Sequence, residues 1–372
     1  MVYLINPDRT KPWNNLPELP IEAQYYRDLD IFEHLGEAKA AIARLQGRSA
    51  AIPNQGILIN TISLQEAKAS SEIENIFTTD DELYKAFSDE TIIKQGPAKE
   101  ILHYRESLWK GHQYLESNQQ FDIPYFEMIY QTITGMRDGI RKPFAHTYIR
   151  QAGSGPNAGK AVYTPPMGSG VVETKMENLI HFMNDDQTFA IDPILKMAMG
   201  HLQFEAIHPF RDGNGRTGRL FNIHFLTQKG LLDLPILFLS KFILDRKDDY
   251  YACLAGVTQR AAWKDWLIFM LQAVENTSTD TYNKINDILA AKDGILNVLE
   301  KETGISRPES LVEAIFTQPY TKVKHLTDKK IYAENTARQY LNQLAEMGIV
   351  ERREISGGHY YMNLELYRIL GN

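Results

Sequence analysis

The sequence predicts a mainly α-helical protein: a helical bundle with one β-hairpin, followed by a smaller C-terminal domain. Apolar residues recur at three- and four-residue spacing through most of the 372 residues, which is the period of a helix with one buried face. Strand-like alternation is scarce before the last sixty or so residues. Short polar turns join the helical segments, as they do in bundles.

The composition is that of a globular protein, with 43% hydrophobic and 23% charged residues and a net charge of -7. This balance argues against nucleic acid or an anionic membrane as the main partner. The one cysteine, Cys253, cannot form an internal disulfide, and the first residues lack the pattern of a secretory signal. No apolar run reaches the roughly 18 residues that span a bilayer. We therefore expect a cytoplasmic protein with no membrane partner.

The elements follow in order from the periodicity. Residues 1–28 are rich in Pro, Asn and Asp and predict an irregular arm. The helical pattern then covers residues 31–45, 64–76, 98–116, 124–137, 173–184 and 193–207. Pro124 and Pro193 suit the first turn of a helix, where no backbone N–H is needed. A further helix is expected from the apolar run that starts at Leu220.

One segment breaks the helical pattern. Residues 148–166 hold two β-prone pieces around a Gly/Pro/Asn turn, which predicts a hairpin that we call the flap. Before and after it the helical spacing is regular. We expect an N-terminal helical region at residues 1–110 and a core domain at residues 111–285.

The pattern changes again near residue 296. A helix over residues 333–347 precedes two strand-like pieces, at 349–353 and 359–363, separated by a Ser-Gly-Gly turn. This order predicts a winged helix-turn-helix domain over residues 296–372.

The most informative stretch is HPFRDGNGRTGR, residues 208–219. Its glycines let the backbone turn tightly and expose N–H groups at the start of the next helix, an arrangement that binds phosphate. The arginines add positive charge, and Asp212 is the hard oxygen ligand that Mg²⁺ prefers. His208 can accept a proton from an incoming hydroxyl. Together they favour transfer of a phosphorus-containing group from a magnesium nucleotide.

Two other phosphate-binding patterns are rejected. Gly213, Gly215 and Gly218 fit GxGxxG, but that fingerprint follows a β-strand and here the preceding segment is helical. The piece GPNAGK resembles the end of a Walker loop. Ser154 replaces its first Gly, and Ala161 replaces the residue that binds magnesium.

Residues 208–219 resemble the signature of Fic domains, HPFx(D/E)GNGRxxR, at every specified position. The resemblance extends over about residues 60–280. It implies an α-helical Fic fold that transfers AMP from ATP to a Thr, Tyr or Ser hydroxyl of target proteins, including the protein itself, with release of pyrophosphate. ATP is then the substrate and Mg²⁺ the cofactor.

The resemblance also implies residue roles. His208 would be the general base, Phe210 would hold the loop, and Asp212 would bind the metal. The nucleotide-binding residues would be Asp212, Gly213, Asn214, Gly215, Arg216, Thr217, Gly218 and Arg219, with the glycines and Asn214 around the α- and β-phosphates and Arg219 reaching the γ-phosphate.

Two further segments resemble family features. Tyr250 and Tyr251 resemble a tyrosine pair that lines the adenine pocket, although Thr258 stands where some members have Asn. The flap residues Lys160, Ala161, Val162 and Tyr163 match the segment that docks the target as an added strand.

Residues 70–75, SSEIEN, resemble the family's inhibitory motif, (S/T)xxxE(G/N), with Ser70 and Glu74 in the defining places. The segment of about residues 62–76 would then be an N-terminal inhibitory helix. A carboxylate delivered to Arg219 would occupy the guanidinium that should hold the γ-phosphate and would repel ATP. Autoinhibition in this family is often tied to a dimer, so a homodimer is a further expectation.

Other residues receive structural interpretations. We expect His201 and His224 on helical faces away from the loop, without a metal, and Arg211 in solvent. The helix at 333–347 could present Arg338 and Gln339 to DNA. Residues 311–372 hold eight basic and seven acidic residues, and this near balance favours protein docking or dimerisation over DNA.

Two alternatives to AMP transfer remain open. The same site could remove AMP from a modified protein or use another phosphate donor. Alternatively, the chain could be a DNA-binding regulator whose core senses nucleotide.

Overall fold

The computed structural model describes residues 4–52, 55–88, 96–145, 147–150, 161–355 and 358–371. These residues form a mainly helical protein with two small antiparallel sheets. The helices are α1 (Leu29–Ala50), α2 (Gly56–Ile73), α3 (Asp80–Ser88), α4 (Pro97–Asn118), α5 (Ile123–Thr134), α6 (Val171–Asn184), α7 (Pro193–Ile207), α8 (Asn214–Gln228), α9 (Leu239–Asp245), α10 (Lys247–Arg260), α11 (Trp263–Glu302), α12 (Pro308–Phe316), α13 (Val323–Asp328), α14 (Glu334–Glu346) and α15 (Leu364–Gly371). The strands are β1 (Ile149–Arg150), β2 (Ala161–Tyr163), β3 (Tyr320–Thr321), β4 (Val350–Ile355) and β5 (Gly358–Asn363).

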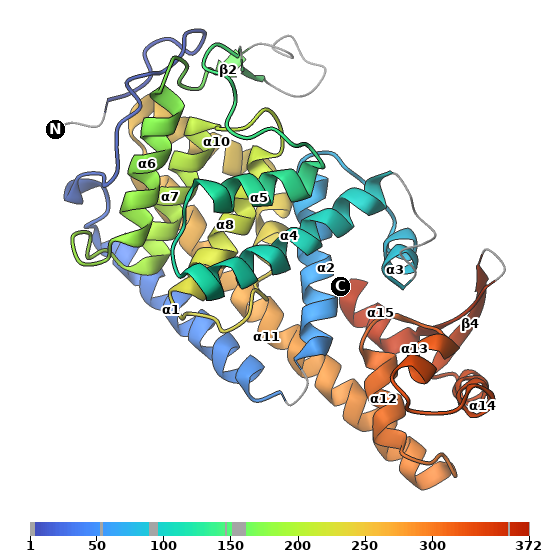
Figure 1. Ribbon diagram of the computed structural model, residues 1–372. Helices are drawn as coiled ribbons and strands as arrows, with labels where there is room; N and C mark the ends of the chain where they lie inside the picture. The colour runs from blue at the N-terminus through green and yellow to red at the C-terminus, as the bar shows by residue number, and fades with distance from the viewer. Residues whose placement is uncertain are drawn as a thin grey trace.

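Helices α7 and α8 form the centre of the bundle and are enclosed by α2, α4, α5, α6 and α11 (Figure 1). Asp192 caps α7 by accepting a hydrogen bond from the Ile194 N–H, and Pro193 follows it in the first turn. Nearly every residue of α7 and α8 is buried. Since a helix enclosed on all sides has no solvent face, these two helices carry the residues of the predicted loop at fixed positions.

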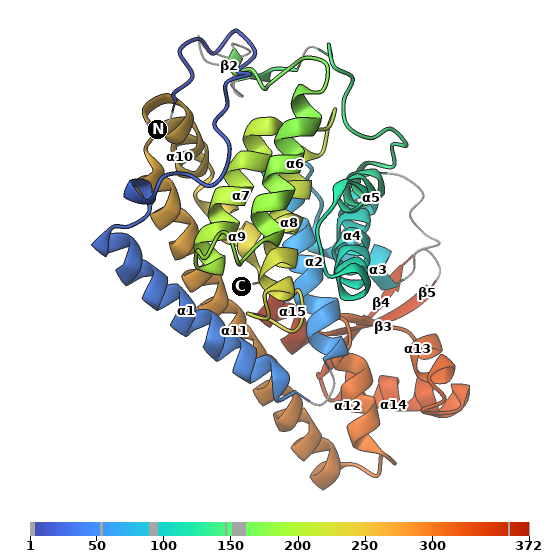
Figure 2. The same ribbon diagram turned by 60° about the vertical axis from the view of Figure 1, so that its left-hand side comes forward.

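Helix α11 is 40 residues long and joins the bundle to the C-terminal part of the chain. Its first half packs in the bundle, where the Trp266 Nε1–H donates to the Ala198 carbonyl at 2.9 Å. Helix α1 lies along it in both views, and its far end extends to α12 (Figures 1 and 2). The helix therefore runs without interruption through positions 285 and 296, where the sequence suggested the end of one domain and the start of the next.

The C-terminal unit, residues 308–371, contains a helix, a short strand, two helices, a β-hairpin and a last helix. The helix α14 and the two strands after it were expected from the sequence, whereas the short strand β3 and the last helix α15 were not. Its sheet has the strand order β3-β5-β4, with Tyr320 opposite Met362 and Val350 opposite Asn363. The apolar face of α14 is buried against this sheet through Leu341 and Leu344. The interpretation as a winged helix-turn-helix domain stays a prediction.

The C-terminal unit contacts the bundle through α3, a helix that the sequence analysis did not identify. The Asp81 carboxylate accepts hydrogen bonds from the Tyr320 hydroxyl and, at 3.0 Å, from Arg353 Nη1. The Ser88 hydroxyl donates to the Tyr320 carbonyl at 3.0 Å. Because α3 follows α2 directly, these contacts fix the segment after the expected inhibitory motif.

The expected bundle helices are confirmed, with differences at their ends. Helix α7 matches the expected range at both ends. Helix α2 starts at Gly56, well before the expected residue 64, and ends at Ile73. It ends early because Asn75 adopts a left-handed conformation, with φ of 62°.

The predicted hairpin is present in its two strands, with Ile149 opposite Tyr163. Lys160 of the expected flap lies outside the described residues. The N-terminal arm packs beside the hairpin: the buried Trp13 ring contacts Tyr163 edge-on, and the Trp13 N–H donates to the Thr164 carbonyl. Among the described helices, none is long and apolar enough to cross a membrane.

We expect Gly111→Ala to destabilise the fold by about 1–3 kcal/mol, because it overpacks a tight helix contact. A Cβ at Gly111 would lie 2.2 Å from Cε1 of His224. That ring cannot move easily, since its nitrogens hydrogen-bond to the Tyr125 hydroxyl and the Leu108 carbonyl. Urea unfolding measures the change.

The matched control is Gly47→Ala in α1, where a Cβ would meet nothing within 4 Å. This variant should gain about 0.4–1 kcal/mol, because alanine restricts the unfolded chain. Equal effects of the two substitutions would contradict the described packing of α4 on α8.

Candidate active site

The loop over residues 208–213 joins α7 to α8 and is held in shape by its own residues. His208 ends α7 in a left-handed conformation, with φ of 50°, and its N–H donates to the Phe204 carbonyl. The Asn214 side chain bonds to both the N–H and the carbonyl of Phe210, each at 2.9 Å. Gly213 has a φ of 66°, which glycine adopts without steric cost. The Asn214 amide therefore closes the loop at the start of α8.

Two groups outside the loop fix it to the bundle. The buried Phe210 ring stacks on Tyr130, with ring centroids 4.4 Å apart. The Arg141 Nε–H donates to the His208 carbonyl at 2.8 Å, while its Nη2 donates to the carbonyls of Ile207 and Pro166. The sequence analysis did not identify Arg141, and since its partners are backbone carbonyls no motif marks it.

The start of α8 is an anion site by geometry. The first backbone N–H groups of a helix have no partner within the helix and carry partial positive charge, and α8 begins at Asn214. A Cβ at Gly215 would lie 2.3 Å from Glu74 Oε1. Only glycine therefore allows a carboxylate or a phosphate to approach the backbone here.

Arg219 is buried and bound by the end of α2. Its Nε–H donates to the Ser70 hydroxyl, and its Nη2 donates to the Ser70 carbonyl and to Glu74 Oε1, each at 2.8 Å. The Arg219 side chain is 1% exposed and the Glu74 side chain 34% exposed. The structure thus brings together Ser70, Glu74 and Arg219, which are far apart in sequence.

In the pair of Glu74 and Arg219, the attraction between opposite charges outweighs the effect of burial on each pKa. Burial disfavours the ionised carboxyl of Glu74, but the Arg219 guanidinium outweighs burial and lowers the pKa of Glu74. Burial likewise disfavours the charged guanidinium, yet Glu74 holds the pKa of Arg219 above its usual range. Both groups are ionised at neutral pH.

His208 is half-buried at the start of the loop. Burial, and next the charge of Arg141, lowers the pKa of His208 to about 4. The imidazole is therefore neutral at pH 7 and able to accept a proton.

Asp212 and Arg216 line a polar cavity of about 330 Å³ together with Lys99, His103 and Thr134. Asp212 is exposed, and one of its oxygens accepts the Gly213 N–H at 2.7 Å. Arg216 is buried and pairs with Glu100 at 3.3 Å. One exposed carboxylate just before a helix N-terminus fits Mg²⁺, which is usually bound through one or two carboxylates plus substrate phosphates.

The two tyrosines of α10 differ in environment. Tyr250 is buried in the core among Trp266 and Phe269, and its hydroxyl bonds to His201 Nε2 at 2.8 Å. Tyr251 is 43% exposed and packs edge-on against Tyr250. Of this pair, Tyr251 is the ring that a nucleotide could touch.

The expected position of His201 is wrong in one respect. The residue is buried, but it lies at the motif: its Nδ1 is 3.2 Å from the Gly218 carbonyl. Because a carbonyl only accepts, Nδ1 carries the proton and Nε2 accepts from the Tyr250 hydroxyl. Burial lowers the pKa of His201 to about 3, so the ring is neutral.

Glu205 is a second residue that the sequence analysis did not identify. Its Oε1 is buried and makes no hydrogen bond within the described part of the chain. A Cβ at Gly218 would lie 2.4 Å from this oxygen. Burial raises the pKa of Glu205 to about 8, since the opposing effect of Arg219 is smaller. At neutral pH this carboxyl is largely protonated.

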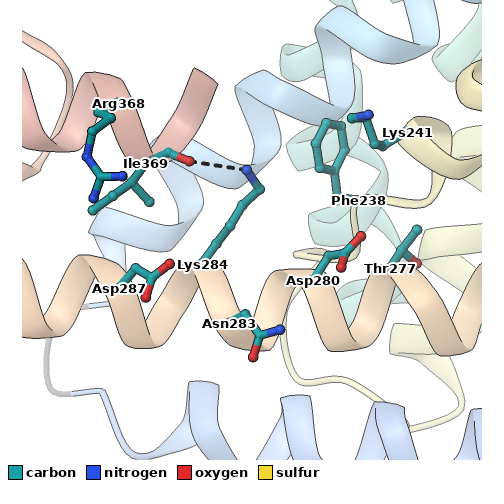
Figure 3. Close-up of a pocket in the computed structure, with 9 residues that line it drawn as sticks. All are labelled: Phe238, Lys241, Thr277, Asp280, Asn283, Lys284, Asp287, Arg368 and Ile369. Atoms are coloured by element: carbon teal, nitrogen blue, oxygen red, sulfur yellow. Dashed lines mark hydrogen bonds between the residues drawn. The ribbon is translucent and has the colours of Figure 1, made fainter. Parts of the chain in front are cut away.

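Two other polar sites, a cluster of three side chains and a cavity, lie away from the loop. His34, Glu37 and Glu275, on α1 and α11, have ligand atoms within 4.8 Å of one another. A cavity of about 250 Å³ between α9, α11 and α15 is lined by residues of both charges, including Lys241, Lys284 and Asp280 (Figure 3). In it, the Lys284 ammonium donates to the Ile369 carbonyl at 3.2 Å (Figure 3). Neither group includes a residue of the motif.

Three family models match the chain. They are described as "Fic/DOC family N-terminal" over residues 32–113, "Fic/DOC family" over residues 120–226, and "Protein adenylyltransferase SoFic-like, C-terminal domain" over residues 297–366. Together these ranges cover more than half of the chain.

Curated relatives carry the same family name. Protein adenylyltransferase fic-1 of Caenorhabditis elegans is 29% identical over 135 residues, which cover 36% of this chain and 24% of that protein. A probable protein adenylyltransferase of Aquifex aeolicus (strain VF5) is 26% identical over 190 residues, 50% of this chain and 54% of that protein. The chain thus spans about half or less of the length of these relatives.

Solved structures share the fold. A Fic family protein from Desulfovibrio desulfuricans G20 superposes with a TM-score of 0.56 at 19% identity, covering 93% of this chain and 98% of that one. Residues 134–508 of Fic-1 from C. elegans give a TM-score of 0.52 at 17% identity, covering 68% and 70%.

We expect the stability cost of Glu205 to grow with pH. An unfolded glutamate has a pKa near 4.5 and the folded one a pKa of about 8, so between these values the folded state keeps a proton that the unfolded state has lost. Wild-type stability then falls relative to Glu205→Gln as pH rises through this window. Urea unfolding at pH 5, 6.5 and 8 measures the difference.

Glu177→Gln, at an exposed glutamate of α6, is the control and should show a difference that does not change with pH. A Glu205→Gln difference that is also constant from pH 5 to 8 would show that Glu205 is not protonated in the folded protein.

Proposed function

Because the chain belongs to the Fic family, we propose that it transfers AMP from ATP to a hydroxyl group of a target protein and releases pyrophosphate. The observation that carries this proposal is the complete motif of residues 208–219, whose first half forms the loop and whose second half begins α8, with a neutral His208 at the start of the loop and the N-terminus of α8 at its end. Relatives named protein adenylyltransferases support it.

In this proposal His208 is the general base. The neutral imidazole takes the proton of the target hydroxyl while the hydroxyl oxygen attacks the α-phosphorus. The bond from the α-phosphorus to the bridging oxygen breaks, and pyrophosphate leaves with the negative charge. The N–H groups at the start of α8, with Arg216 and Arg219, would hold the phosphate oxygens during this exchange.

Asp212 would hold Mg²⁺, which supplies positive charge to the phosphates when it is bound. Tyr251 would contact the adenine from α10. Strand β2 of the flap would dock the target segment, and the hydrogen bond from the Tyr163 hydroxyl to the Ala206 carbonyl, 2.8 Å long, ties that strand to the end of α7. The docked segment would therefore lie at a fixed distance from His208.

We propose that Glu74 restrains this activity. The Nε–H of Arg219 donates to the Ser70 hydroxyl, and its Nη2 donates to the Ser70 carbonyl and to Glu74. A γ-phosphate can therefore reach the guanidinium only after Glu74 leaves. The carboxylate also lies against Gly215, at the open start of α8. ATP bound with Glu74 in place would meet like charge at both contacts.

Replacing Glu74 with glycine should raise AMP transfer by about 10- to 100-fold, the range that corresponds to the 1.5–3 kcal/mol of a hydrogen bond to a charged group. The assay uses magnesium and ATP labelled in turn at the α- and γ-phosphate, with covalent label sought on the protein and on lysate proteins. Label from the α position alone identifies AMP as the transferred group.

The control is Glu72→Ala, which removes a carboxylate from the same turn of α2 that faces Lys68 rather than Arg219. It should leave the rate near that of wild type. If Glu72→Ala activates as strongly as Glu74→Gly, general loosening of the helix and not the Arg219 contact explains the restraint.

Replacing His208 with asparagine in the Glu74→Gly background should lower AMP transfer by about 10²- to 10⁴-fold, the usual contribution of a general base. Asparagine tolerates the left-handed conformation of residue 208, so the loop is kept. Thermal unfolding should therefore change little. Transfer that persists at the Glu74→Gly rate would rule out His208 as the base.

The alternative of AMP removal is tested with the same proteins. The Glu74 side chain is partly exposed beside Gly215, so it could orient a water toward a phosphate bound there. Release of AMP from a labelled protein by wild type, and not by Glu74→Gly, would favour that activity over transfer.

A further inference from the structure

Arg141 is a buried cation that forms no direct ion pair within the part of the chain that the structure describes. Its side chain is among the buried charged groups, with 5% of the residue exposed. Its hydrogen bonds go to three backbone carbonyls, those of Pro166, Ile207 and His208. Burial lowers the pKa of Arg141, and the Glu173 carboxylate, which lies beyond ion-pair distance, opposes this only in part. The Nη1 of Arg141 is buried without a hydrogen-bond partner. Buried charges are normally paired, because burial without a partner is costly.

Arg141 lines a groove that is positively charged overall. The groove has a volume of about 570 Å³, and its walls are formed by Asp138, Arg141, Lys142, Ala145, Thr147, Tyr148 and Arg211. Lys142 and Arg211 are exposed. The one acidic residue, Asp138, already accepts a hydrogen bond from the Tyr130 hydroxyl at 2.7 Å.

The groove lies beside the loop that carries the candidate general base. Arg141 binds the His208 carbonyl directly, and Arg211 belongs to the same loop as His208. Tyr148, which also lines the groove, directly precedes strand β1 of the flap. A chain that lies in the groove therefore contacts a residue of the loop and a residue next to the flap. No residue of α2 or α8 lines the groove, so it is separate from the contacts of Glu74 and Arg219.

We infer that this groove receives the target protein and selects segments that carry an aspartate or glutamate close to the modified hydroxyl. The carboxylate would pair with Lys142 and Arg211 at the surface and would bring a negative charge near the buried Arg141. Lys142 and Arg211 are then specificity-determining residues, and Arg141 positions the loop. The inference rests on the proposed function, because it names the substrate class of the same site.

The test uses the Glu74→Gly protein, magnesium, α-labelled ATP and matched synthetic peptides. Each peptide has one Thr, Tyr or Ser, with Asp or Glu at one to four positions on either side, and its twin has Asn or Gln there. The acidic peptides should be modified with a kcat/KM about three- to tenfold higher, as expected for pairs with exposed cations, and added salt should reduce the difference.

Charge reversal supplies the variant. Lys142→Glu combined with Arg211→Glu should abolish the preference and favour peptides with Lys in place of Asp or Glu. Arg137→Glu is the matched control, since Arg137 is exposed on the same loop as Lys142 but does not line the groove. The Arg137→Glu variant should prefer acidic peptides to the same extent as the Glu74→Gly protein. Thermal unfolding and label on the protein itself report that each variant is folded and active.

Equal kcat/KM for acidic and neutral twins, or a preference that survives charge reversal, would overturn the inference while leaving AMP transfer intact. If peptides take no label but lysate proteins do, the labelled sites are sequenced. Enrichment of Asp and Glu around them, lost with the charge-reversed variant, supports the inference, and no enrichment overturns it. Absence of label on peptides, lysate and the protein itself overturns the proposed function, and the inference falls with it.

Discussion

The ion pair between Arg219 and Glu74 joins the middle of the bundle to the end of α2. A guanidinium that is 1% exposed needs an anion, because the interior does not replace the water that a charge loses on burial. Helix α8 places this cation in the middle of the bundle, and the end of α2 supplies the anion from residues 145 positions away in sequence. In the absence of a ligand, Glu74 thus neutralises Arg219. Any phosphate that binds Arg219 must replace Glu74 as its anionic partner.

The position of Glu74 is set by contacts all along α2. The buried Glu66 accepts hydrogen bonds from the Tyr104 hydroxyl and from the backbone N–H and the hydroxyl of Ser240, which tie α2 to α4 and α9. Gln65 and Lys68 then bind Tyr84 and Asp80 of α3.

These links continue beyond the bundle. Helix α3 is held in turn by the C-terminal unit through Asp81 and Tyr320, and the ring of Tyr84 packs edge-on against Tyr367 of α15. The carboxylate that neutralises Arg219 is therefore carried by a helix that is attached both to the core and to the C-terminal unit. Its position is not a local property of residues 70–75.

The sequence predicted those features whose causes are local. Both ends of helix α7 were predicted correctly, because Asp192 and Pro193 begin the helix and the motif follows its last residue. The loop was predicted because glycines and charged residues at this fixed spacing have few functions other than phosphate binding. The length of α11 was not predicted. Apolar residues at helical spacing, including Ile285, Ile288 and Leu299, continue into its later part, but the sequence does not show that this part packs against α12 and α15.

The same limit explains the residues that sequence reasoning missed. Arg141 binds backbone carbonyls, and the Oε1 of Glu205 makes no hydrogen bond within the described residues, so neither belongs to a pattern of side chains. His201 was placed away from the loop because helical spacing gives the face of a helix but not what packs on it. Tyr250 and Tyr251 are adjacent in sequence, yet only the packing of Trp266 and Phe269 decides which ring is buried.

The glycines of the motif explain why the site holds two carboxyl groups in different protonation states. A Cβ at Gly215 would collide with Glu74, and one at Gly218 would collide with Glu205, so a carboxyl group approaches the first two turns of α8 at each glycine. Two carboxylates near one guanidinium repel each other, and the ionised form goes to the one with the better contact. Glu74 makes the hydrogen bond to Arg219, and its pKa is lowered, whereas burial raises the pKa of Glu205. Because Gly215 and Gly218 have no side chain, both carboxyl groups can approach α8, but only the ionised Glu74 neutralises Arg219. Glu74 lies on the side from which an incoming phosphate would bind.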